Sequence, residues 1–81
     1  MTYVRDDYDI TTLAIFDKYA ISVERVFESD FGANWHLMDM NLDEPFQNKH
    51  CFRVDALRKN TANDYTHFFY VIVNEQPHCI R

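Results

Sequence analysis

The sequence predicts an α+β domain in which one helix packs on an antiparallel sheet of four to five strands. An amphipathic stretch near the N-terminus has the spacing of a helix, and several later stretches alternate with a period of two. A chain of 81 residues has room for one domain, so residues 1–81 are expected to form a single domain. Its 47% hydrophobic and 16% aromatic content is typical of a folded chain with a small core.

The first predicted elements are a short strand over Met1–Arg5 and a helix over Ile10–Ala20. The acidic residues just before Ile10 favour a helix N-terminus through the helix dipole. Apolar residues then recur every three to four positions, which predicts a stripe that faces the core. This stripe consists of Ile10, Leu13, Phe16 and Ala20.

The period changes to two at Ile21, which predicts a half-buried strand that continues to Glu28. Residues 30–34 hold Gly32, the only glycine in the chain, and are expected to form a turn. A second strand is predicted over Trp35–Leu42. The two strands together are interpreted as a hairpin.

Two interpretations are open for residues 45–60. The alternation over Cys51–Leu57 predicts a strand. Alternatively, an Asp-Glu-Pro start and a Leu-Arg-Lys-Asn end would suit a helix that begins near Pro45 and ends near Asn60. Residues 58–64 are polar and are expected to form a turn.

The strongest predicted strand is Tyr65–Val73, which is apolar on both faces and should therefore lie in the middle of the sheet. One helix can cover only one of these faces. The other face must be covered by loops, by the tail Gln76–Arg81 or by a second protein chain.

Charge is distributed in blocks along the chain. Residues 22–48 contain six acidic residues and one basic residue, whereas residues 49–60 contain four basic residues and one acidic residue. The acidic block either keeps a small protein soluble or forms a docking face for a basic partner. The residues expected to bind that partner are Glu24, Glu28, Asp30, Asp39, Asp43 and Glu44, with Trp35 as an aromatic anchor.

We therefore expect a small acidic protein-binding module and no enzyme. Such a module could inhibit a nucleic-acid-handling protein by offering carboxylates to the lysines and arginines that grip phosphate. Phage anti-defence proteins, antitoxins and nuclease immunity proteins share this size and charge. The alternative is a homodimeric structural or regulatory subunit. A third interpretation is a small hydrolase or ribonuclease built from His67, Tyr70 and Arg53.

Other classes of function are disfavoured by the residues present. The doublets His50-Cys51 and His78-Cys79 lack the Cys-x-x-Cys spacing of zinc sites, so neither a metal nor another cofactor is expected. One glycine is too few for a phosphate-binding loop, and a net charge of −5 disfavours direct binding to nucleic acid. Without an apolar span or an export signal, we expect a cytoplasmic protein with free thiols and no membrane contact.

Overall fold

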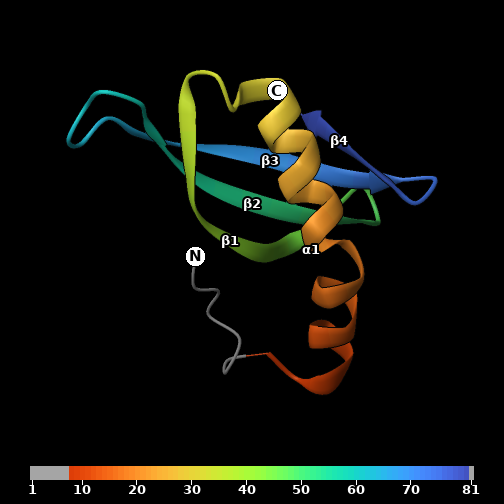
Figure 1. The fold of residues 1–81 in the computed structure, drawn as a ribbon. Helices are drawn as coiled ribbons and strands as arrows, with labels where there is room; N and C mark the ends of the chain where they lie inside the picture. The colour runs from red at the N-terminus through yellow and green to blue at the C-terminus, as the bar shows by residue number, and fades with distance from the viewer. Residues whose placement is uncertain (1–7, 81) are drawn as a thin grey trace.

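The computed structural model describes residues 8–80 and confirms the α+β fold class, with one helix on a four-stranded antiparallel sheet. Helix α1 (Ile10–Phe31) lies on one face of the sheet (Figure 1). The strands follow in chain order as β1 (Trp35–Phe46), β2 (Lys49–Arg58), β3 (Tyr65–Val73) and β4 (Gln76–Ile80). Each strand pairs with the next, which gives the order β1-β2-β3-β4. The strand predicted over Met1–Arg5 lies outside the described residues.

Helix α1 begins where the sequence predicts and ends eleven residues later than predicted. Asp9 caps its N-terminus, because the Asp9 side chain accepts a hydrogen bond of 2.7 Å from the Thr12 N–H. The helix ends at Gly32, where a Cβ atom would collide with the Glu28 carbonyl oxygen. The only glycine therefore allows the chain to leave the helix closely packed against its last turn.

The predicted hairpin over residues 21–42 is wrong in its first half. Residues from Ile21 to Phe31 are helical, because the apolar positions Val23 and Phe27 continue the three- and four-residue spacing of the N-terminal stripe. Alternation over a few residues also satisfies a strand pattern, and packing on the sheet decides between the two. The helical side chains that pack into the core are Phe16, Tyr19, Ala20, Val23 and Phe27.

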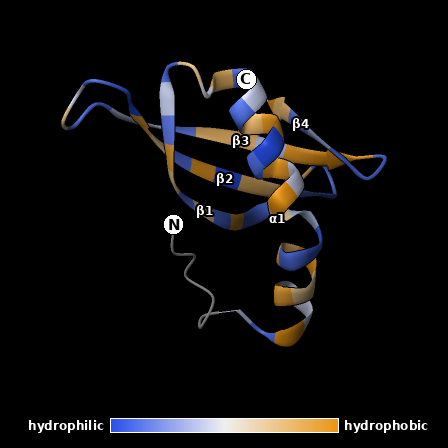
Figure 2. Cartoon of the chain, viewed as in Figure 1, coloured by the Kyte–Doolittle hydropathy of each residue, from blue (hydrophilic) through white to orange (hydrophobic). Residues whose placement is uncertain are grey.

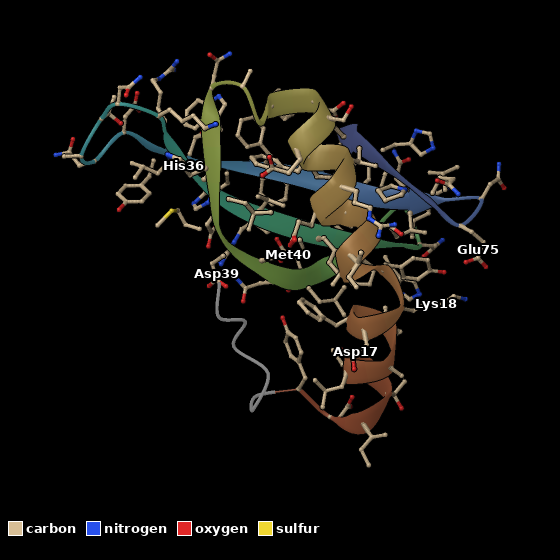
Figure 3. The ribbon with its side chains drawn as sticks, in the orientation of Figure 1. Asp17, Lys18, His36, Asp39, Met40 and Glu75 are labelled. Carbon is tan, nitrogen blue, oxygen red and sulfur yellow. The ribbon has the colours of Figure 1, made fainter. Side chains whose placement is uncertain are left out.

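Strand β1 begins at Trp35 as predicted and runs past Leu42 to Phe46. Its pairing with β2 slips between Leu37 and Asp39, which marks a β-bulge at Met38. The bulge reverses the alternation, so that Leu37 and Met40 both pack toward the helix. Asp39 consequently points to the opposite face of the sheet, as Figure 3 shows beside Met40.

The remaining strands resolve the open alternative, since residues 49–58 form strand β2 and no helix starts near Pro45. Strand β3 has the predicted bounds and is an inner strand, paired with both β2 and β4. The tail does not cover a face of the sheet but adds strand β4 to its edge. Two-residue turns close β1–β2 and β3–β4, with positive φ angles at residues 47, 48, 74 and 75.

The core lies between the helix and one face of the sheet. Phe52, Val54 and Tyr70 are fully buried there. Figure 1 shows that the N-terminal part of α1 extends past the β1 edge, which explains why Ile10 is 86% exposed. Residues 8–80 place no element over the opposite face, which we call the open face. No helix in the described part of the chain is long and apolar enough to cross a membrane.

Candidate interaction surfaces

The outer edge of β1 is the most acidic strand surface in residues 8–80. Strand β1 contains Asp39, Asp43 and Glu44 and no lysine or arginine. It pairs with β2 on one side only, so its other side borders the solvent and the start of α1. Tyr8 reaches this edge, because its hydroxyl accepts a hydrogen bond of 2.7 Å from the Leu42 N–H.

Side chains cap the backbone of this edge at alternate positions. The Met40 N–H donates to Asp39 Oδ1 at 2.9 Å, and the Glu44 N–H donates to Asp43 Oδ1 at 2.8 Å. With the Leu42 N–H bonded to Tyr8, three successive edge donors already have acceptors. An edge strand with occupied donors is a poor template for another strand. At these three positions the β1 edge therefore presents side-chain oxygens rather than free backbone N–H donors.

The carboxylates predicted from residues 22–30 lie on α1 and not on a hairpin. Glu24 and Glu28 are one helical turn apart and share a flank of the helix. Asp30 has a structural role, because Asp30 Oδ2 accepts a hydrogen bond of 3.0 Å from the hydroxyl of buried Tyr70. The predicted acidic patch is thus divided between the helix and β1, because residues 22–31 are helical.

Trp35 lies at the start of β1 and is half-buried. Its ring packs edge-on against Phe68, with centroids 5.4 Å apart, and the Arg58 guanidinium lies 4.6 Å from its centroid. Phe68 in turn stacks on Phe31 at the end of the helix. The indole therefore joins the end of α1 to the sheet, and a part of it is still accessible.

The open face has a cluster of charged side chains at its centre, built around Asp55, which the sequence did not single out. Asp55 Oδ1 lies 2.6 Å from His67 Nδ1 and 3.1 Å from Arg53 Nε. Arg53 and Asp55 form an ion pair, but the N–H at Arg53 Nε does not point at the carboxylate, because Nε makes no hydrogen bond. The antiparallel register brings the three residues together: Asp55 and His67 are direct cross-strand partners, and Arg53 is two positions along β2. Sequence alternation alone could not reveal this pairing.

Of the three residues suggested for a ribonuclease, Arg53 and His67 meet at Asp55, but Tyr70 does not join them. Arg53 and His67 lie on the open face, whereas Tyr70 is buried on the helix side of the sheet. Burial and the Asp30 carboxylate raise the pKa of Tyr70, which makes it a poor proton donor or acceptor near neutral pH. The described residues enclose no pocket.

The two His-Cys doublets are likewise separated by strand geometry. His50 lies beside Tyr19 with ring centroids 6.2 Å apart, while Cys51 faces the other side of β2. Cys51 and Cys79 form no disulfide and lie on opposite faces of the sheet. Over residues 8–80, no three side chains of His, Cys, Asp or Glu gather as metal ligands.

Glu75 in the β3–β4 turn fixes the position of this turn on the helix. Glu75 Oε2 accepts a hydrogen bond of 2.7 Å from the Tyr19 hydroxyl and lies 3.3 Å from Lys18 Nζ (Figure 3). These two donors lower the pKa of Glu75, and the carboxylate raises the pKa of Lys18. The contact is structural and leaves this carboxylate occupied within the chain.

Comparison of the chain with family models, curated proteins and solved structures finds no match. A function for this protein therefore has to be argued from its own surfaces.

Proposed function

We propose that this chain is a protein-binding module that docks on a basic partner through the acidic edge of β1. The observation that carries the proposal is the edge strand itself, with Asp39, Asp43 and Glu44 and no lysine or arginine between positions 35 and 46. Exposed charges of one sign steer a partner of the opposite sign and increase the rate of association.

The capped backbone supports recognition by charge. Because side-chain oxygens occupy the N–H groups of Met40, Leu42 and Glu44, a partner gains little by adding a strand to this edge. A partner rich in lysine and arginine can instead pair with the carboxylates. Proteins that grip phosphate carry such basic surfaces, so the partner class that fits best is a nucleic-acid-handling protein. The chain would then act as its inhibitor.

The experiment begins with a pull-down from lysate of the native host and identification of the captured protein by mass spectrometry. Association and dissociation rates are then measured at several salt concentrations. We expect association to slow steeply as salt increases, because exposed charges are screened beyond about 8 Å at physiological ionic strength. Dissociation should change less. DNA or RNA added to the purified partner should compete with the chain for binding.

The deciding variant is Asp39→Asn with Glu44→Gln, which removes two charges at the β1 edge and retains an amide oxygen to cap Met40. The matched control is Glu24→Gln with Glu28→Gln, which makes the same change in net charge on the helix flank. Slower association in the first variant and not in the control supports docking at β1. Equal slowing in both would show a dependence on net charge alone, and no slowing in either would refute the proposal.

The expected role of Trp35 as an anchor is tested separately. A Trp35→Ala change would also disturb the contacts with Phe68 and Arg58. Trp35→Phe keeps an aromatic ring at this site and removes the indole N–H and part of the ring area. Faster dissociation of Trp35→Phe, with an unchanged association rate and melting temperature, would assign the indole to the interface.

A further inference from the structure

The open face combines apolar side chains with charges that are arranged in rows across the strands. Phe69 on β3 and Ile80 on β4 are direct cross-strand partners on this face and are only partly buried, and Tyr65 is 58% exposed. Figure 2 shows apolar residues along the C-terminal half of β3, which alternate between this face and the helix side. An inner strand that is apolar on both faces is expected to be covered on both faces. Helix α1 supplies one of these covers.

Association through an edge of the sheet is disfavoured at both ends. The donors of β1 are capped, as described above. Strand β4 has five residues, and one of them is Pro77, which has no N–H to offer. A second protein that covers this sheet would therefore have to stack on its open face.

The rows on the open face define which occupant fits. In one row, Arg53 on β2 lies beside Phe69 on β3. In the next row, Asp55 lies beside His67. A third row contains Asp43 on β1 and His78 on β4, joined through Cys51 and Val71.

We propose that the open face binds the open face of a second copy of this chain, about a twofold axis that runs parallel to the strands between β2 and β3. This operation places β2 over the partner's β3 and β1 over the partner's β4. Arg53 then faces the ring of the partner's Phe69, a favourable arrangement for a cation. Asp55 faces the partner's His67, and Asp43 faces the partner's His78. Each contact occurs twice, as a twofold interface requires.

The charges also disfavour a twofold axis that runs perpendicular to the strands at the Phe69 row. Such an axis would stack Phe69 on the partner's Phe69. It would also place Arg53 against the partner's Arg53 and Asp39 against the partner's Asp43. Juxtaposed like charges oppose association, so the strand-parallel axis is favoured.

The size of the face predicts a reversible dimer. The four strands are spaced about 4.8 Å apart and average nine residues in length, which at about 3.3 Å per residue gives a face equivalent to roughly 19 by 30 Å. Its projected area of roughly 570 Å² per copy is near the lower end for specific interfaces. We therefore expect an equilibrium between monomer and dimer that depends on protein concentration.

Sedimentation equilibrium of the purified chain, over a concentration series from low to high micromolar, tests the dimer without any other protein. Phe69→Asp should shift the equilibrium to monomer at every concentration. Ile21→Asp is the matched control, because Ile21 is 63% exposed on the helix and does not belong to the open face. If circular dichroism shows that Phe69→Asp is unfolded, Ile80→Asp on edge strand β4 takes its place.

A charge exchange tests the register. Asp43 and His78 lie on the two outer strands, about 14 Å apart across three strand spacings, so they do not contact each other within one chain. Asp43→Lys and His78→Asp should each weaken the dimer by several-fold. The double variant should recover affinity, since Lys and Asp would then face each other across the interface.

Three results would overturn the proposal. The first is a chain that stays monomeric throughout the concentration series. The second is a dimer that survives in folded Phe69→Asp or Ile80→Asp, or that Ile21→Asp abolishes, because the interface would then lie elsewhere. The third is additivity of the Asp43 and His78 changes, which would refute this axis. All three are independent of the basic partner proposed above.

Discussion

The two faces of the sheet use neighbouring residues of the same strands for different purposes. On the helix side, Phe52 and Tyr70 are fully buried in a continuous apolar core. On the open face, Arg53 and Phe69 occupy the adjacent positions and are only partly buried. The difference shows that apolar alternation identifies a strand, but only the position of the covering helix separates a stabilising face from one that is available for binding.

The largest expected effect is a loss of stability, and it is tested on two phenylalanines in neighbouring strands. Phe52→Ala removes a fully buried ring from the core and should destabilise the protein by about 3 to 5 kcal/mol. Phe69→Ala removes a partly exposed ring from the open face and should destabilise the monomer by about 1 kcal/mol. Urea titrations at low protein concentration measure both values. Equal losses would show that the open face is covered as completely as the core.

The stability lost in Phe69→Ala, measured at low and at high protein concentration, tests the same comparison of the two faces further. If the open face forms a dimer, the stability lost on substitution should increase with concentration, because only the parent protein gains stability from association. Phe52→Ala should show no comparable increase in the stability lost. This contrast requires only urea titrations repeated at two concentrations.

The buried hydroxyl of Tyr70, which is hydrogen-bonded to Asp30, should make stability fall in alkali. Burial and the Asp30 carboxylate raise the pKa of Tyr70 in the folded state. Above a pH of about 10, the unfolded chain therefore loses this proton while the folded chain retains it, and stability should fall by about 1.4 kcal/mol per pH unit for this group. Tyr70→Phe has no proton to lose at this position. Comparing urea titrations of parent and variant from neutral to alkaline pH isolates the effect.

Asp30 itself provides the next smaller test. Asp30→Ala leaves the hydroxyl of buried Tyr70 without its acceptor, so we expect a loss of about 1 to 3 kcal/mol. Asp30→Asn retains an oxygen acceptor and should be milder. The melting temperatures of both variants measure the difference. A fully stable Asp30→Ala protein would show that Asp30 has no structural role and can contribute to the acidic surface.

The smallest expected effect concerns the chemistry of a thiol on the open face. Cys51 is 4% exposed, and its burial together with the Asp43 carboxylate raises the pKa of its thiol. Because the thiolate is the reactive form, Cys51 should be alkylated more slowly than a free cysteine at the same pH. Mass spectrometry of a Cys79→Ser protein after timed exposure to iodoacetamide measures the rate. Rapid alkylation of folded protein would show that this part of the open face opens readily.

The sequence by itself determined the fold class, the start of the helix and the bounds of the strongest strand. Ile10 follows an Asp cap, and Tyr65–Val73 is apolar over its whole length, so local signals were sufficient there. It also indicated that β1 would begin at Trp35. These features depend on neighbours within one or two turns or on a single strand.

Tertiary structure decided the features that depend on distant partners. Residues 21–28 satisfied both a helix and a strand pattern, and the contacts of Val23 and Phe27 with the sheet selected the helix. As a result, Glu24 and Glu28 lie on the helix and not beside β1, and Asp30 accepts a hydrogen bond from Tyr70. The bulge at Met38 then set the face of Asp39, and strand register brought Asp55 to His67. Such positions are determined by pairing and packing between segments that are distant in sequence, so a local sequence pattern cannot predict them.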